Sequence, residues 1–179
     1  SFVYLGMKIF RITLVLLLAL LTSTVSSAQE SNVDSGVKWQ SLEEAQKKAK
    51  ETGKKVLIFG YADWCTYCMK MRKETYPTEN VQKSLSDDFI PVQINGESEE
   101  EIVFNGKTYK SYELARYLRL SSYPTHYFLN SDGEIIGAQP GFLPAEVFSP
   151  LMNYVSEDLF GKVPFLDYME KKGIKLEQD

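Results

Sequence analysis

The sequence is poor in side chains that bind metals or form covalent links. It has only two cysteines, Cys65 and Cys68, and one histidine, His126, in 179 residues. A structural zinc site needs about four ligands, so zinc is poorly supplied here. Covalent haem attachment through this pair would need a histidine directly after Cys68, where the sequence has Met69. A Cu(I) site formed by both cysteines, a methionine and His126 remains an alternative, because soft sulfur ligands select Cu(I).

A long apolar run is also missing. The first 28 residues contain no acidic side chain, and their apolar stretch from Ile12 to Leu21 is only about ten residues long. A membrane anchor would need roughly 20 apolar residues to span a bilayer. A short apolar segment that follows the basic Lys8 and Arg11 is instead typical of a secretory signal peptide.

Small residues then mark a cleavage site. Ser26 and Ala28 precede Gln29 at the positions that signal peptidase requires. We therefore predict that residues 1–28 are a signal peptide, with Met7 as the true start, and that residues 29–179 form one domain in the periplasm. No cysteine lies near the cleavage site, so we do not expect a lipoprotein.

Basic side chains are outnumbered by acidic ones, 20 to 24. Loss of Lys8 and Arg11 would leave 18 basic and 24 acidic residues, a net charge of −6. This balance disfavours nucleic acid as a partner. The acidic run at 97–101 is interpreted as a solvated loop.

The spacing of the two cysteines excludes an ordinary structural role for them. Exported proteins normally use disulfides between segments that are distant in sequence. Cys65 and Cys68 are three residues apart, so a bond between them closes almost no loop and gains little stability through chain entropy. We therefore expect the pair to serve chemistry.

The chain alternates between helix and strand signals. Ser41 and Glu44 form a capping box, and apolar residues at helical spacing predict a helix over 42–52 that ends at Gly53. An apolar run at 56–59 predicts a buried strand that leads directly to the cysteines. Further helices are expected over 65–74, after a cap at Thr78, after a cap at Ser111, over 144–156 and over 164–172, and Pro150 should kink or split the helix over 144–156. Further strands are expected over 89–94, 125–129 and 134–138. A hairpin insertion is expected in 96–110. This order predicts an α/β sandwich with a mixed sheet.

The residues around the cysteines carry a resemblance. The stretch Tyr61-Ala62-Asp63-Trp64-Cys65-Thr66-Tyr67-Cys68, together with Tyr123-Pro124-Thr125, resembles the thioredoxin superfamily, and the similarity runs from about Trp39 to Tyr154. It implies a thioredoxin-like three-layer sandwich. The insertion and the C-terminal tail are more similar to bacterial periplasmic members than to the minimal thioredoxin.

The resemblance also implies a substrate groove. In it, Pro124 would face the sulfurs and the backbone of Tyr123 would pair with an extended substrate segment. Tyr123-Pro124 is a candidate cis peptide bond, since such bonds are nearly confined to proline; a trans proline that merely starts a strand is the alternative. The groove residues are expected to be Trp64, Thr66, Tyr67, Tyr123, Pro124 and Thr125.

Elementary thiol chemistry assigns a role to each cysteine. A helix N-terminus lowers the pKa of a thiol, and Cys65 occupies that position. Cys68 follows one turn later on the same face, where it can attack a mixed disulfide on Cys65. Positive charge from Lys70, Arg72 and Lys73 could assist, although a solvated helix face is the simpler interpretation of these residues.

One departure from the family pattern concerns proton transfer. Many thioredoxins carry a buried acid six residues before the first cysteine, where this chain has Phe59. Asp63 is a weak substitute because we expect it to be exposed. His126 is expected to be a satisfied or partly exposed side chain without a catalytic role.

We therefore predict an exported thiol:disulfide oxidoreductase that acts on protein disulfides through Cys65 and Cys68, as a monomer without a cofactor or metal. The pair Thr66-Tyr67 does not reveal the direction of electron flow. The overall resemblance favours a reductase, which would need a membrane electron donor. The alternative is a binding protein, either a Cu(I) chaperone or a client-binding member of the same fold.

Overall fold

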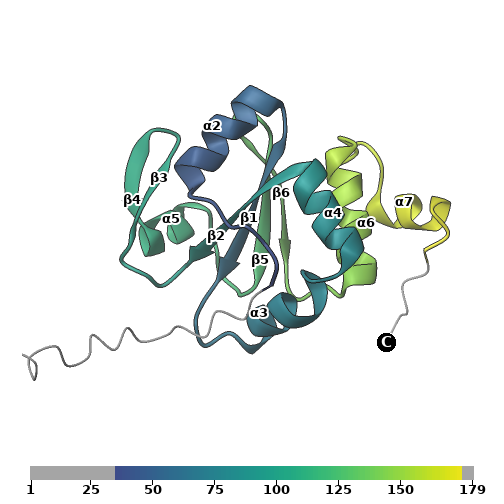
Figure 1. The fold of residues 1–179 in the computed structure, drawn as a ribbon, viewed down its shortest axis with the longest axis horizontal. Helices are drawn as coiled ribbons and strands as arrows, with labels where there is room; N and C mark the ends of the chain where they lie inside the picture. Colours follow the sequence, from purple (N-terminus) through teal and green to yellow (C-terminus); the bar gives the residue numbers. More distant parts are fainter. Residues whose placement is uncertain (1–34, 175–179) are drawn as a thin grey trace, which may run out of the picture. The chain divides into compact units, whose positions relative to one another are not determined.

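The computed structural model describes residues 35–174, and the predicted signal peptide therefore lies outside the described residues. Helices and strands alternate through this part of the chain (Figure 1). In chain order they are α2 (Leu42–Thr52), β1 (Lys55–Tyr61), α3 (Thr66–Lys70), the π-helical turn η1 (Met71–Thr75), α4 (Glu79–Asp87), β2 (Phe89–Asn95), β3 (Glu101–Phe104), β4 (Lys107–Lys110), α5 (Ser111–Tyr117), β5 (Thr125–Leu129), β6 (Ile135–Pro140), α6 (Ala145–Ser156) and α7 (Phe165–Lys171).

The central sheet has the strand order β2-β1-β5-β6 and is mixed. Strand β1 runs parallel to β2 and antiparallel to β5, which in turn pairs antiparallel with β6. Pro91 lies on the edge strand β2, where its missing N–H costs little, and its carbonyl accepts a bond from the Gln40 N–H at 3.0 Å. The predicted mixed sheet is confirmed.

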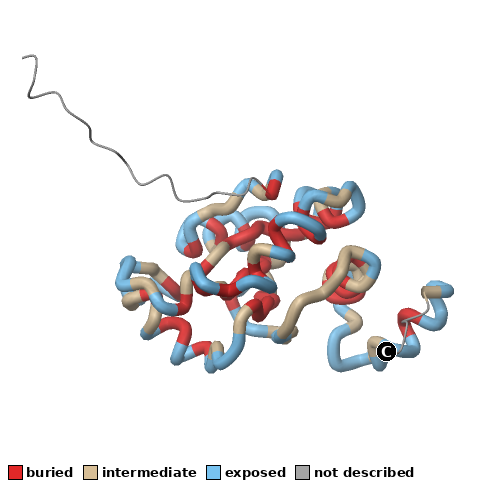
Figure 2. The backbone as a smooth tube through the Cα atoms, turned by 90° about the horizontal axis from the view of Figure 1, so that it is seen from below, coloured by how far each residue is buried: buried red, intermediate tan, exposed pale blue. Residues whose placement is uncertain are grey.

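Helices cover both faces of the sheet, so β1 is buried on both sides. Leu57 and Phe59 point into one core with α3, η1, α4 and α6, whereas Val56 and Ile58 point into a second core with α2 and α5. Figure 2 shows buried residues gathered in the interior of the domain, while much of the outer backbone is exposed. These three layers are the arrangement that the thioredoxin resemblance implies.

The predicted first helix is confirmed with its bounds. The Ser41 side chain accepts a hydrogen bond from the Glu44 N–H at 3.3 Å, and Gly53 ends the helix with φ 73°. The predicted insertion hairpin is also present as β3 and β4, which turn at Asn105 and Gly106 with φ 50° and 75°. Both turn residues adopt the left-handed conformation that such short hairpin turns require.

The predicted helix after the cysteines is confirmed, although it changes from α to π geometry at Met71, and π turns leave no clear signal in sequence. Two local predictions were wrong, the cap at Ser111 and the split at Pro150. Lys110, not Ser111, precedes α5, because the Ser111 hydroxyl instead donates to the Asn95 carbonyl. Helix α6 continues through Pro150 as one element, since buried residues on both sides of the proline, Phe148 and Leu151, hold it against the sheet.

No helix within residues 35–174 is both long and apolar enough to cross a bilayer.

Candidate active site

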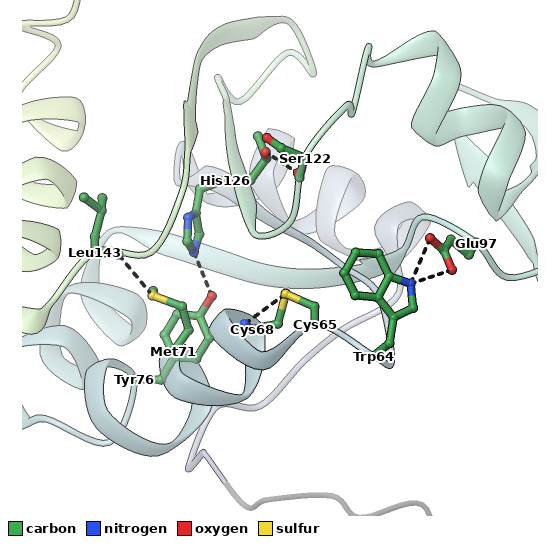
Figure 3. Close-up of a disulfide and its surroundings, with 10 residues drawn as sticks. Trp64, Cys65, Cys68, Met71, Tyr76, Glu97, Ser122, His126 and Leu143 are labelled. Atoms are coloured by element: carbon green, nitrogen blue, oxygen red, sulfur yellow. Dashed lines mark hydrogen bonds between the residues drawn. A yellow bond between two sulfur atoms is a disulfide. The ribbon is translucent and has the colours of Figure 1, made fainter.

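The two cysteines form a disulfide at the point where β1 gives way to α3 (Figure 3). Cys65 is the N-cap residue of α3, and its Sγ accepts a hydrogen bond from the Cys68 N–H at 3.0 Å. Cys65 and Cys68 are only 3% and 1% exposed. A backbone donor aimed at Sγ of Cys65 would stabilise negative charge on that sulfur once the disulfide is reduced.

Trp64 stands beside the disulfide on the solvent side and is 69% exposed. Its Nε1–H donates to both carboxylate oxygens of Glu97, at 3.1 and 3.0 Å. The indole also meets the Tyr123 ring edge-on, with ring centroids 5.9 Å apart. The sequence analysis placed Glu97 in a solvated loop; its side chain is exposed, but it holds the tryptophan that flanks the disulfide.

The Tyr123-Pro124 peptide bond is cis. Pro124 is buried, and its carbonyl accepts a bond from the Gly141 N–H at 2.8 Å. Burial raises the pKa of Tyr123, and the negative charge of Glu97 raises it further. Thr125 is also buried, and its hydroxyl donates to the Ser122 carbonyl at 2.8 Å, so its side chain is turned into the protein.

The residues between the cysteines, Thr66 and Tyr67, are exposed, as a groove role requires. The Tyr67 ring lies 6.1 Å from that of Phe142, and the Lys70 ammonium lies 4.5 Å above the Phe142 ring. Phe142 follows Gly141 in the chain, so the loop that bonds Pro124 also reaches the active-site helix. The sequence analysis did not identify Phe142, because nothing near it in sequence marks it as a neighbour of Tyr67.

The π-helical turn holds this loop in place. Met71 Sδ accepts a bond from the Leu143 N–H at 3.5 Å, and the Thr75 hydroxyl donates to the Leu143 carbonyl at 2.7 Å. Figure 3 shows Met71 further along the same helix as the cysteines, with Leu143 facing it. Met71 is fully buried, as expected for core packing, and its sulfur also bonds the loop backbone.

Aromatic rings occupy the space behind the disulfide. Phe59, at the position of the expected family acid, is completely buried and stacks between Trp39 and Tyr61, with ring centroids 5.7 Å from each. Asp63 is exposed, as predicted, and its Oδ2 accepts a bond from the Asn95 side-chain amide at 2.9 Å. It therefore points away from the buried side of the cysteines.

His126 lies on β5 opposite Phe59 and is fully buried; of the two expectations for it, a satisfied or a partly exposed side chain, partial exposure is therefore wrong. Its Nε2 shares a 2.8 Å hydrogen bond with the Tyr76 hydroxyl, whereas its Nδ1 has no partner within the described part of the chain. Burial lowers the pKa of His126 to about 3, so the imidazole is neutral near pH 7. A base of such low pKa cannot take a proton from a thiol in place of the missing acid.

The position of Arg72 also differs from the prediction. A solvated helix face was expected for it, yet Arg72 is only 7% exposed, because it lies four residues after buried Cys68 and shares its side of the helix. Its guanidinium carbon lies 4.8 Å from the Tyr61 ring centroid and 5.2 Å from that of Phe59. One amino group donates to Gln93 Oε1 at 2.8 Å.

Metal ligands are not grouped in this structure. Among residues 35–174, no three His, Cys, Asp or Glu side chains lie close enough together to hold a metal ion. Cys65, Cys68 and His126 therefore do not form a three-ligand group, which leaves the Cu(I) alternative with sulfur ligands.

Comparison with known proteins agrees with this geometry. A family model for the thioredoxin-like domain matches residues 42–156. A thiol:disulfide interchange protein DsbD from Actinobacillus pleuropneumoniae is 30% identical over 130 residues, which cover 71% of this chain and 21% of that protein. The DsbD protein of Vibrio cholerae is 27% identical over 133 residues, which cover 74% of this chain and 18% of its own length. The chain therefore spans about a fifth of these relatives.

Solved structures show the same fold at low identity. A thioredoxin-fold protein from Helicobacter pylori superimposes with a TM-score of 0.64 at 15% identity and covers 80% of this chain and 96% of that one. A thioredoxin from Thermus thermophilus gives a TM-score of 0.52 at 23% identity, over 65% and 85% of the two chains. With the family model matched across most of the fold and a bonded Cys-x-x-Cys pair at the expected junction, the chain belongs to the thioredoxin-like family.

Proposed function

We propose that this protein is an exported thiol:disulfide oxidoreductase that exchanges disulfides with other periplasmic proteins through Cys65 and Cys68. The observation that carries the proposal is the disulfide at the start of α3, where the Cys68 N–H already points at the Cys65 sulfur. The interchange activity named for the DsbD relatives supports the same chemistry.

The exchange begins with Cys65 as a thiolate. Its sulfur attacks a disulfide of the partner, an S–S bond forms between the two proteins, and one partner sulfur leaves as a thiolate. Cys68 then loses its proton and attacks Cys65, which restores the internal disulfide and releases the second partner thiolate. Two electrons have passed from this protein to its partner, and both partner sulfurs take up protons from water.

The partner would bind along the groove predicted from the sequence. The exposed Trp64, Thr66 and Tyr67 offer one side, and the backbone of Tyr123 and buried Pro124 offer the other. Thr125 would contribute its backbone only, since its hydroxyl is bonded internally. The exposed rings of Trp64 and Tyr67 suit an extended peptide with apolar side chains.

Export, direction and partners complete the proposal. The N-terminal sequence supports secretion through a cleaved signal peptide into the periplasm, and the acidic balance of the chain argues against nucleic acid as a partner. We infer that the protein works as a reductase and as a monomer, re-reduced by a membrane electron donor. The thiol:disulfide interchange named for the DsbD relatives supports such a transfer of electrons.

The proposal is tested by trapping the intermediate. In Cys68→Ala the mixed disulfide on Cys65 has no resolving thiol, so non-reducing gels of the exported protein should show discrete adducts that dithiothreitol removes. The matched control is Cys65→Ala, which should trap almost no partner, because the remaining Cys68 thiol does not occupy the N-cap position where backbone N–H groups favour a thiolate. The expression host must supply the natural partners.

Two outcomes would oppose the proposal. Absence of any dithiothreitol-sensitive adduct from Cys68→Ala would count against exchange with protein disulfides. A tight stoichiometric Cu(I) complex that both variants lose, with no trapped partner, would favour the copper chaperone instead.

A further inference from the structure

Arg72 is a buried cation without an anion. No carboxylate within residues 35–174 forms an ion pair with its guanidinium, and its one side-chain hydrogen bond goes to the neutral Gln93. The rings of Tyr61, Phe59 and Trp39 surround it, with centroids 4.8, 5.2 and 5.8 Å from the guanidinium carbon. Burial of a charge without a counter-ion costs stability, so we expect Arg72 to have a function besides packing.

We propose that Arg72 tunes the redox pair: its buried positive charge stabilises the Cys65 thiolate and so favours the dithiol over the disulfide. The inference rests on the proposed exchange function, because only an exchanging pair would use such tuning. In re-reduction, the dithiol of the proposed electron donor supplies two electrons and breaks the Cys65–Cys68 bond, which leaves a thiolate on Cys65 and, after uptake of one proton, a thiol on Cys68. The donor dithiol becomes a disulfide and releases its second proton to water.

The charge acts through a dry, aromatic layer. Cys68 lies four residues before Arg72 on the same helix, and Phe59, which stacks under the guanidinium, belongs to the same buried cluster as both cysteines. Little solvent is present there to screen the field. If the charge lowers the pKa of the Cys65 thiol by about one unit, the equilibrium shifts by up to about tenfold.

The other buried titratable groups packed around Arg72 are neutral at pH 7. Tyr76 has its pKa raised by burial, although the Arg72 charge works against that rise, and burial lowers the pKa of His126 to about 3. Tyr61 is the phenol under the guanidinium. The charged side chains nearest in sequence and on the active-site rim are exposed to solvent: Asp63, Lys70, Lys73, Glu74 and Glu97. Arg72 thus supplies the charge on the buried side of the cysteines.

A purely structural role makes different predictions. If Arg72 only pins η1 to the sheet, its loss would lower stability and leave the thiol–disulfide equilibrium unchanged. The control for charge is Lys73, the next residue, which is exposed on the same helix. Water screens its ammonium, so its removal should have little effect on the sulfurs.

The experiment measures the equilibrium of purified oxidised protein with glutathione, together with the pH dependence of Cys65 alkylation. Arg72→Met should shift the equilibrium about tenfold toward the disulfide, a potential about 30 mV more negative, and alkylation should require a higher pH. Arg72→Lys keeps the positive charge and should keep most of the wild-type equilibrium with glutathione. Lys73→Met should shift that equilibrium less than twofold.

A second variant keeps the test decisive if Arg72→Met does not fold. Gln93→Glu retains the hydrogen bond to Arg72 but places a carboxylate against the guanidinium, so it should shift the equilibrium in the same direction as Arg72→Met. A wild-type equilibrium in both folded variants, or an equal shift in Lys73→Met, would overturn the inference. Because these values belong to the isolated protein, failure to trap a partner with Cys68→Ala would refute the exchange function separately.

Discussion

Gly96 shows how one missing side chain shapes the active-site surface. A Cβ on Gly96 would lie 2.2 Å from the Tyr123 hydroxyl oxygen and within 2.9 Å of two ring carbons. Tyr123 in turn meets the Trp64 ring, so the glycine lets the aromatic pair beside the disulfide settle over the end of β2. The conformation of Gly96 is ordinary; space alone demands a glycine here.

We expect Gly96→Ala to displace Tyr123 and Trp64, with an overpacking cost of about 1–3 kcal/mol and slower exchange with protein disulfides. Chemical denaturation and Trp fluorescence of the folded variant would measure both effects. Adding Tyr123→Phe to this variant removes the hydroxyl oxygen, which is the atom nearest to the new Cβ, and should recover part of the lost stability. Wild-type stability and exchange rate in Gly96→Ala would show that the ring moves without consequence.

At the scale of elements, the π-helical turn links the active-site helix to the loop on the other side of the site. The turn bonds both the N–H and the carbonyl of Leu143, and the neighbouring Phe142 packs against Tyr67. An α-helical continuation would place Met71 and Thr75 differently around the helix axis. The irregular turn therefore helps to fix the loop that carries Phe142 against the active-site helix.

Thr75→Val tests this link, because it keeps the shape of the side chain and removes the hydroxyl that bonds Leu143. The buried Leu143 carbonyl bond is lost, so we expect a decrease of about 1 kcal/mol in the free energy of unfolding and a slower reaction with protein substrates. Thr75→Ser keeps the hydroxyl and should therefore show a smaller decrease in stability and in reaction rate than Thr75→Val. Equal behaviour of the two variants would argue that the hydroxyl does not hold the loop.

At the scale of the whole molecule, buried His126 couples the stability of the fold to pH. The unfolded imidazole has a pKa of about 6.5, and the folded one has a pKa of about 3. Between these values only the unfolded chain binds the proton. The free energy of unfolding should therefore fall as the pH drops from about 6.5 toward 3, by about 1.4 kcal/mol per pH unit for this one group.

The comparison is with the double variant His126→Phe/Tyr76→Phe, which removes both the titrating ring and its hydrogen-bond partner. Urea denaturation at several pH values should give a pH slope that is smaller by one proton between about pH 4 and 6. Exposed carboxylates titrate equally in both proteins and cancel in the difference. Identical slopes would mean that His126 is hydrated or paired in solution.

Local patterns in the sequence are enough to predict the order of the elements and the reactive pair. Local signals suffice for these: Ser41 and Gly53 bound a helix, Asn105 and Gly106 turn a hairpin, and the three-residue spacing of Cys65 and Cys68 belongs to one helical turn. The Tyr123-Pro124 candidate was also recognisable, because few peptide bonds other than those before proline adopt cis.

The surroundings of the sulfurs follow from the packing of the layers. Arg72 was interpreted as part of a solvated helix face, yet it is buried on the helix side that carries Cys68, and His126 is fully buried where β5 pairs with β1. Glu97 and Phe142 reach the site from segments 33 and 75 residues away from Trp64 and Tyr67, the residues that they contact. Contacts between distant segments depend on how the layers pack, and no local pattern in the chain encodes them.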